Sequence, residues 1–238
     1  MENKKKQKKI VEMFNDIAPT YDKANRVLSM GVDIQWRKKA CDETFNRYKN
    51  DIDLIVDVAC GTGDMMGYWK KRAKKRKREI KKLLGVDPSI GMVNVGKKKF
   101  PKFEFVISDA TSIPLEDESA DILSISYGIR NVIKRTEAFT EFARVLKTGG
   151  YVVILEFTKD DKKGLFFRLK DSYMNKVLPK LGGFISKNKE AYEYLPTSIE
   201  CFLTSDMMQR ELDEAGFDIE FVKSFSMDIS TLVIAKKR

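Results

Sequence analysis

The sequence predicts an α/β protein in which a mostly parallel sheet carries helices on both faces. Short apolar runs alternate with segments of helical periodicity through most of the chain, and this order builds parallel sheets. One apolar run, residues 54–56, breaks into a glycine turn whose sequence over residues 57–64 is DVACGTGD. Because glycine lacks a Cβ, such a turn brings backbone close to a ligand. The two observations together predict a binding site at one edge of the sheet.

The first 50 residues are expected to form a helical cap. Four apolar residues recur at i, i+3, i+4 and i+7, the spacing of an amphipathic helix that stops before Ala18-Pro19. They are Ile10, Met13, Phe14 and Ile17. Residues 21–48 are also expected to be helical.

Seven strands are expected after this cap, with helices between them. They comprise residues 53–58, 82–87, 103–108, 121–127, 151–157, 219–225 and 229–235. The helix after Gly63 continues into a basic segment. Apolar residues at helical spacing from Ala138 to Leu146 predict a helix that ends with Gly149-Gly150 as its C-cap. A further helix is expected to begin at Ser205 and to end at Gly216.

Residues 158–204 interrupt this alternation with an apolar-rich insertion. An insertion at the carboxyl end of a sheet is a natural lid over a substrate pocket, so a helical substrate lid is expected here. An extra helical layer that only stabilises the fold is the alternative.

No histidine occurs in the chain. This excludes a Ser-His-Asp triad, a Cys-His dyad and histidine-bearing zinc sites, and no metal site is expected. A general base must be an aspartate, a glutamate, a tyrosine, a lysine, an arginine acting through water, or the substrate itself.

The chain carries 45 Lys and Arg against 35 Asp and Glu, a net charge of +10. Basic residues concentrate in residues 4–9 and 70–82. Such runs bind anionic lipid or nucleic acid, but they also form solvated helix faces. Residues 70–82 contain no aromatic side chain for base stacking, so only non-specific nucleic-acid binding is expected of them.

The three scattered cysteines suit a reducing compartment. The basic N-terminus is followed by no apolar segment of a signal peptide, and no stretch approaches the ~18–20 apolar residues of a membrane span. These features predict a cytoplasmic protein.

Four predicted strand ends place polar residues at one edge of the sheet, where ligands bind in open α/β folds. The loop after the second strand offers Asp87, whose carboxylate can accept from both hydroxyls of a ribose. The third strand end offers Asp109 and Ala110 to an adenine. Ala59 replaces the first glycine of the dinucleotide fingerprint, and no pyrophosphate-binding third glycine follows. A cofactor with one ribose and no phosphate, such as S-adenosylmethionine, is favoured; incidental glycines are the alternative.

Arg130 and Asn131 follow the fourth strand and a glycine, so they are expected to face the reacting centre. Methyl transfer to carbon needs alignment, exclusion of water and an ionised ring hydroxyl. Arg130 can stabilise that phenolate, and Asp22, Asp109 or a bound water can take the proton. The alternative is that Asn131 caps a helix and Arg130 forms a structural ion pair.

These residues resemble the menaquinone/ubiquinone C-methyltransferase family of class I S-adenosylmethionine-dependent methyltransferases over nearly the whole chain. The most specific motifs are Gly-Ile-Arg-Asn-Val at 128–132 and Tyr-Asp-x-x-Asn at 21–25. Further matching motifs lie at residues 14–20, 28–31, 36–37, 144–150, 155–157, 192–195 and 198–199. The chain departs from the family at Asp33 and Val233, where the family usually has histidine, and at Thr148, where it usually has proline.

The resemblance implies a Rossmann-like class I methyltransferase fold, here one domain over residues 1–238. It implies C-methylation of a prenylated hydroquinone, with demethylmenaquinol favoured and a methoxybenzoquinol precursor of ubiquinol as the alternative. Two alternatives of other classes remain. The net charge is compatible with a basic RNA methyltransferase or RNA-binding protein, and the fold alone is compatible with a catalytically inactive scaffold. The resemblance implies S-adenosylmethionine as the cofactor.

The expected site residues combine the strand-end argument with the resemblance. The expected cofactor-binding residues are Asp57, Gly61, Thr62, Gly63, Asp87, Asp109, Ala110 and Ser126. The expected catalytic residues are Asp22, Arg130 and Asn131. The expected substrate-binding residues are Tyr21, Arg130, Tyr173 and Tyr194.

An enzyme that acts on a prenylated quinol has to reach the bilayer. Peripheral association with the inner face of the membrane, through the basic and apolar segments, is therefore expected. No specific nucleic-acid partner is expected. The sequence leaves the oligomeric state open, a homodimer included.

Overall fold

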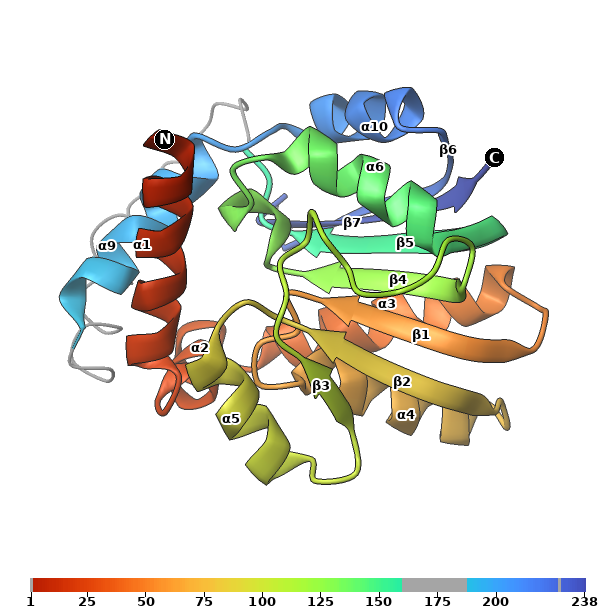
Figure 1. The fold of residues 1–238 in the computed structure, drawn as a ribbon, viewed down its shortest axis with the longest axis horizontal. Coiled ribbons are helices and arrows are strands. Elements are labelled where there is room, and N and C mark those ends of the chain that lie inside the picture. The colour runs from red at the N-terminus through yellow and green to blue at the C-terminus, as the bar shows by residue number, and fades with distance from the viewer. Residues whose placement is uncertain (1, 160–187, 227) are drawn as a thin grey trace.

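The computed structural model describes residues 2–159, 188–226 and 228–238. Its centre is a seven-stranded sheet of order β3-β2-β1-β4-β5-β7-β6 (Figure 1). The strands are β1 Ile52–Val58, β2 Ile80–Val86, β3 Glu104–Val106, β4 Ala120–Ser126, β5 Leu146–Glu156, β6 Phe217–Phe225 and β7 Ser230–Lys237. Every pairing from β3 to β5 is parallel, and β7 runs antiparallel to both β5 and β6. The predicted mostly parallel sheet is confirmed.

Helices cover both faces of this sheet. Helices α6 (Arg135–Val145) and α10 (Ser205–Glu214) bury Phe139, Phe142 and Leu212 on one face. Helices α3 (Val32–Arg47) and α4 (Asp64–Lys75) bury Phe45 and Trp69 on the other. Both faces of the sheet are covered, so its central strands β1, β4 and β5 are mostly buried and hydrophobic.

The carboxyl ends of the parallel strands are covered by α1 (Glu2–Ile17), α2 (Tyr21–Leu28) and α9 (Lys189–Glu200) (Figure 1). Helix α1 is fixed against α5 (Ile90–Lys99) by one side chain. The Asn15 Oδ1 atom accepts from the Ser89 hydroxyl at 2.8 Å and from the Gly91 N–H at 2.9 Å. Of the expected cap of residues 1–50, α1 and α2 therefore lie over the edge at which the sequence predicts the site, whereas α3 packs on a face of the sheet.

The predicted C-cap at Gly149-Gly150 is wrong. Helix α6 ends at Val145, and both glycines lie inside β5. A Cβ on Gly150 would come within 2.8 Å of the Lys147 carbonyl oxygen and 3.0 Å of that of Asp121. The register of β4 against β5 shifts at this point. The glycines therefore permit close approach of the backbone where the strand is irregular. In sequence, a glycine pair with this role looks the same as one that caps a helix.

The long basic run lies away from the cap. Residues 76–82 connect α4 to β2 and form the start of β2, while Asp87 follows the other end of that strand. A strand of this length spans about 20 Å. Much of the run is therefore at the opposite edge of the sheet from the predicted site. Within the described ranges, no helix is long and apolar enough to cross a membrane.

Candidate functional site

Three cavities meet where the cap covers the strand ends. The strand-end cavity, about 260 Å³, is lined by Ala59, Asp87, Asp109 and other loop residues, and by α1. The loop cavity, about 30 Å³, lies at the glycine turn beside Asp57 and Thr62. The apolar cavity, about 360 Å³, lies among α1, α2, α3 and α9. Tyr21 lines all three, and Phe14 and Tyr127 line the strand-end and apolar cavities. These aromatic residues mark the boundary between the two larger spaces.

Asp87 occupies the end of β2 in the strand-end cavity. Its two carboxylate oxygens accept from the backbone N–H groups of Gly61 and Ser89, each at 2.8 Å. These bonds orient the carboxylate and leave each oxygen with a further lone pair. Burial raises the pKa of Asp87 to about 6, although both backbone bonds oppose that shift. Hydroxyl donors from a bound ligand would further favour the ionised form.

Among the buried polar atoms beside these cavities that have no hydrogen-bond partner in the described part of the chain are Asp57 Oδ2 and Ser126 Oγ. Asp57 Oδ1 accepts from the Ser124 hydroxyl at 2.6 Å, and Trp69 Nε1 donates to that hydroxyl at 2.9 Å. Burial raises the pKa of Asp57 to about 7. Buried polar atoms are rarely left unpaired in a folded protein, so these two indicate that a polar ligand completes the site.

The backbone around the cavities is locally strained. Ala59 has a φ of 48° and Tyr127 a φ of 59°, the left-handed region that bulky residues rarely adopt. Both residues line the strand-end cavity. A Cβ on Gly128 would lie 2.5 Å from the Ala59 Cβ. The ends of β1 and β4 are thus held closer together than ordinary side chains allow, as is common at functional sites.

Arg130 is buried at the wall of the apolar cavity. Its Nη1 donates to Glu156 Oε1 at 2.5 Å and to the Tyr127 carbonyl at 2.8 Å, and its Nε donates to the Ser198 hydroxyl at 3.3 Å. Glu156 is fully buried, and burial raises its pKa while Arg130 opposes the shift. Arg130 therefore forms a buried ion pair and also presents a guanidinium to the apolar cavity.

Asn131 lies in a different cavity from its neighbour Arg130. It lines the strand-end cavity, and its Oδ1 accepts from the Tyr194 hydroxyl at 3.1 Å. Tyr194 itself lines the apolar cavity, so this bond connects the two spaces. Asn131 belongs to a short 3-10 turn and makes no cap at the start of α6. The capping alternative for Asn131 is therefore wrong.

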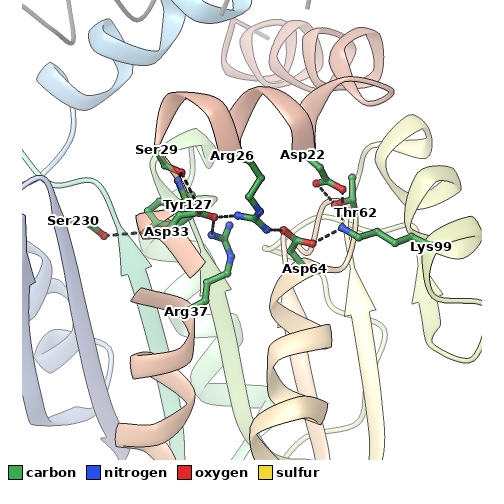
Figure 2. Close-up of polar contacts among 11 residues, drawn as sticks. Asp22, Arg26, Ser29, Asp33, Arg37, Thr62, Asp64, Lys99, Tyr127 and Ser230 are labelled. Atoms are coloured by element: carbon green, nitrogen blue, oxygen red, sulfur yellow. Dashed lines mark hydrogen bonds and ion pairs between the residues drawn. The ribbon is translucent and has the colours of Figure 1, made fainter. Parts of the chain in front are cut away.

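Asp22 belongs to a network of charges that joins α2 to the glycine turn and α5 (Figure 2). It accepts from the Thr62 hydroxyl at 2.6 Å and from Lys99 Nζ at 2.7 Å. It lines the loop cavity and not the apolar cavity. Asp22, which the sequence suggests as a proton acceptor, is thus already paired with a cation and with a hydroxyl of the glycine turn.

The network continues through side chains that the sequence reasoning did not select. Lys99 also pairs with Asp64, Arg26 joins Asp64 to Asp33, and Arg37 donates to Asp33 at 2.7 Å (Figure 2). The sequence signal that could have identified the Asp33–Arg37 pair is its i, i+4 spacing on one helix.

The remaining predicted residues divide by location. Those that line the strand-end or loop cavity are Asp57, Gly61, Thr62, Asp87, Asp109, Ala110 and Ser126. Gly63 lines none of the three; its φ of 81° begins α4, and a Cβ there would contact Phe105 at 3.0 Å. One oxygen of Asp109 is already bonded to Thr111. Tyr173 lies outside the described residues.

The strand-end and loop cavities fit S-adenosylmethionine. Asp87 suits a ribose diol, and Asp57, which lines the loop cavity, has an unpaired carboxylate oxygen that suits an α-ammonium group. The nucleoside and amino-acid parts therefore have suitable groups in these two adjoining spaces.

Comparisons with known proteins agree with this geometry. The model of the ubiE/COQ5 methyltransferase family matches residues 1–237. The chain is 55% identical to the ubiquinone/menaquinone biosynthesis C-methyltransferase UbiE of Campylobacter jejuni, over 98% of this chain and 99% of that protein. It is 35% identical to the demethylmenaquinone methyltransferase of Bacteroides fragilis, over 98% and 94%.

Solved structures show the same fold at low identity. A SAM-dependent methyltransferase from Thermotoga maritima has a TM-score of 0.61 at 17% identity, covering 96% of this chain and all of that one. A SAM-dependent methyltransferase from Aquifex aeolicus has a TM-score of 0.57 at 17% identity, covering 83% and 89%. The chain belongs to the ubiE/COQ5 methyltransferase family and is an S-adenosylmethionine-dependent C-methyltransferase.

Proposed function

We propose that this enzyme methylates a ring carbon of a prenylated naphthoquinol, converting a demethylmenaquinol to a menaquinol. The observation that carries the proposal is the apolar cavity beside the cofactor site, which presents a buried guanidinium, Arg130, among aromatic and aliphatic side chains. An aromatic ring with an ionisable hydroxyl fits these surroundings. The names of relatives at 55% and 35% identity support a quinol as the acceptor.

The residues have separable tasks in this proposal. S-adenosylmethionine, when bound, supplies an electrophilic methyl group. Asp87 and Asp57 hold its ribose and amino-acid ends, while Tyr21, Phe14 and Tyr127 separate the two larger cavities and exclude water. Arg130 stabilises the oxyanion of the quinol ring, which makes the neighbouring carbon nucleophilic. A bound water or a carboxylate of the network takes the hydroxyl proton. Transfer of the methyl group would break its bond to sulfur and leave S-adenosylhomocysteine, and the methylated ring carbon would then lose its hydrogen as a proton, which restores the aromatic ring.

The choice of acceptor is tested by supplying methyl-labelled S-adenosylmethionine with three acceptors in separate reactions. They are a short-chain reduced demethylnaphthoquinone, a short-chain reduced methoxybenzoquinone, and RNA. Label in the naphthoquinol alone is expected. Label in both quinols would extend the activity to ubiquinone precursors, and label confined to the benzoquinol or to RNA would overturn the proposal.

Asp87→Ala is expected to raise the Kd of S-adenosylmethionine about 100-fold, because two hydrogen bonds to a charged group are lost. Isothermal titration of the variant and the wild type measures the change. The variant keeps the buried ion pairs of the network, so its melting temperature without ligand is the check on folding. An unchanged Kd would remove Asp87 from the ribose site.

We also propose that the turn between α2 and α3 docks on a lipid surface and admits the prenyl chain. Val27, Met30 and Val32 are exposed at this turn, Met30 by 82%. Met30 and Val32 also line the apolar cavity, so the exposed apolar surface is continuous with it. The basic residues 76–82, at the other edge of the sheet, are not part of this surface.

Met30→Glu is expected to weaken binding to anionic phospholipid vesicles about tenfold or more, since insertion of a methionine side chain is worth about 1.5–3 kcal/mol. Turnover of a short-chain, water-soluble quinol should stay near the wild-type rate. Met207→Glu is the matched control, because Met207 is an exposed methionine on α10, away from the cavity. Equal losses in vesicle cosedimentation for both variants would contradict this docking surface.

A further inference from the structure

Arg37 is a buried cation with unused hydrogen-bond donors. Its residue surface is 7% exposed, and its Nη1 donates to Asp33 Oδ2 at 2.7 Å. Its Nε is fully buried and has no partner among the described residues. Its guanidinium carbon lies 4.9 Å from the centre of the Tyr127 ring, which restricts its position further. A buried guanidinium N–H without an acceptor is costly, so an acceptor is expected to arrive with a ligand.

Within the described ranges, Arg37 makes fewer ion pairs than its neighbour Arg26. Arg26 lies between two carboxylates, Asp33 and Asp64 (Figure 2). Arg37 makes one ion pair in the described part of the chain, with Asp33, and shares that carboxylate with Arg26 and with the Ser29 hydroxyl, which donates to Asp33 Oδ1 at 2.8 Å. Of the two guanidiniums, Arg37 therefore has more N–H groups without a carboxylate partner among the described residues.

Arg37 lines both the apolar cavity and the loop cavity, and it shares the loop cavity with Asp57. Asp57 has the opposite charge and an unpaired carboxylate oxygen, Oδ2. The two groups are close enough for the charge of Arg37 to act on the carboxyl of Asp57. One small space is thus flanked by an unsatisfied buried acceptor and an unsatisfied buried donor. This pairing is complementary to a zwitterion, whose ammonium and carboxylate are separated by a single carbon.

We propose that Arg37 binds the α-carboxylate of the methionine part of S-adenosylmethionine, opposite Asp57, which accepts from the α-ammonium. Asp33 positions Arg37 for this contact. The loop cavity adjoins the strand-end cavity through Ala59, Gly61 and Ser126, which line both, so the amino-acid end continues from the nucleoside end. The inference concerns the cofactor and does not depend on which quinol is methylated.

The test compares S-adenosylmethionine with its decarboxylated analogue, which lacks only the carboxylate. The wild type is expected to bind the analogue about 10- to 100-fold more weakly by isothermal titration. Arg37→Gln should weaken binding of S-adenosylmethionine by a similar factor and leave the Kd of the analogue within about threefold. Arg37→Lys should recover part of the lost affinity.

Arg26→Gln is the matched control, because Arg26 also pairs with Asp33 and lines the loop cavity. It is expected to change the Kd of both ligands by the same factor. Equal losses for both ligands in Arg37→Gln would overturn the proposal, and so would an unchanged Kd for both. The wild-type comparison needs no variant to fold: equal affinity for the two ligands would also overturn it.

Discussion

Arg130→Ala is expected to lower kcat for a reduced demethylnaphthoquinone by about 10²–10³-fold, the usual cost of removing one preorganised group that stabilises a developing oxyanion. The Kd of S-adenosylmethionine should change little, because Arg130 lines the apolar cavity and not the strand-end or loop cavity. Single-turnover rates with labelled cofactor, together with titration of the cofactor, separate the two effects.

The loss of Arg130 also leaves Glu156 buried without its cation. Breaking such a pair costs about 3–5 kcal/mol when the remaining charge cannot reach solvent. The double variant Arg130→Ala/Glu156→Gln removes that charge, so it should recover melting temperature without recovering turnover. Arg135→Ala, which breaks the partly buried pair of Arg135 on α6 with Glu211 on α10, is the control and should keep full activity. Full turnover in Arg130→Ala would show that its role is structural alone.

The Kd of S-adenosylmethionine is expected to rise by about tenfold as pH falls from 7.5 to 6, since only ionised Asp57 attracts a cationic ligand. Burial raises the pKa of Asp57 to about 7 in the free protein, so this carboxyl takes up a proton within that range. Asp57→Asn should weaken binding at pH 7.5 and remove most of the pH dependence. Asp87, with a pKa of about 6, should add its own decline about one pH unit lower.

The raised pKa of Asp57 also makes the stability of the folded protein depend on pH, and for stability the neutral carboxyl is the favourable form. The pKa of Asp57 in the folded protein lies above its value in the unfolded chain. Its contribution to the free energy of unfolding is therefore fully present below the unfolded pKa of 3.8 and is lost as pH rises through about 7. Asp57→Asn should therefore melt at a higher temperature than the wild type at pH 8 without ligand, and show no such gain at pH 4. A Kd that is flat with pH in the wild type would contradict the assignment of Asp57.

Much of this architecture could be predicted because alternating apolar runs and helical stripes specify a parallel sheet, and because its strand ends must meet at one edge. Asp87 and Ser126 were found in this way: each follows or ends a strand, and each lines the strand-end cavity. The limits of β5 were missed because Gly149-Gly150 looks the same in sequence whether it ends a helix or relieves a close contact between strands.

Arg37 was missed for a different reason. Its importance depends on Asp33, Arg26 and Asp57, which come from α3, α2 and β1 and meet only in the folded protein. The sequence also predicted that Arg130 and Asn131 face the same reacting centre. In the structure they belong to a tight turn and line different cavities. Pairings across elements and the direction of adjacent side chains in a turn are set by tertiary packing.

The most direct test is the position of the transferred methyl group. The wild-type enzyme is given ¹³C-methyl S-adenosylmethionine and a short-chain reduced demethylnaphthoquinone, and the product is examined by NMR. A ¹³C methyl on the free ring carbon next to the hydroxyl-bearing carbon is the result predicted. A methyl on a quinol oxygen, or no transfer by enzyme that binds the cofactor, would contradict quinol C-methylation.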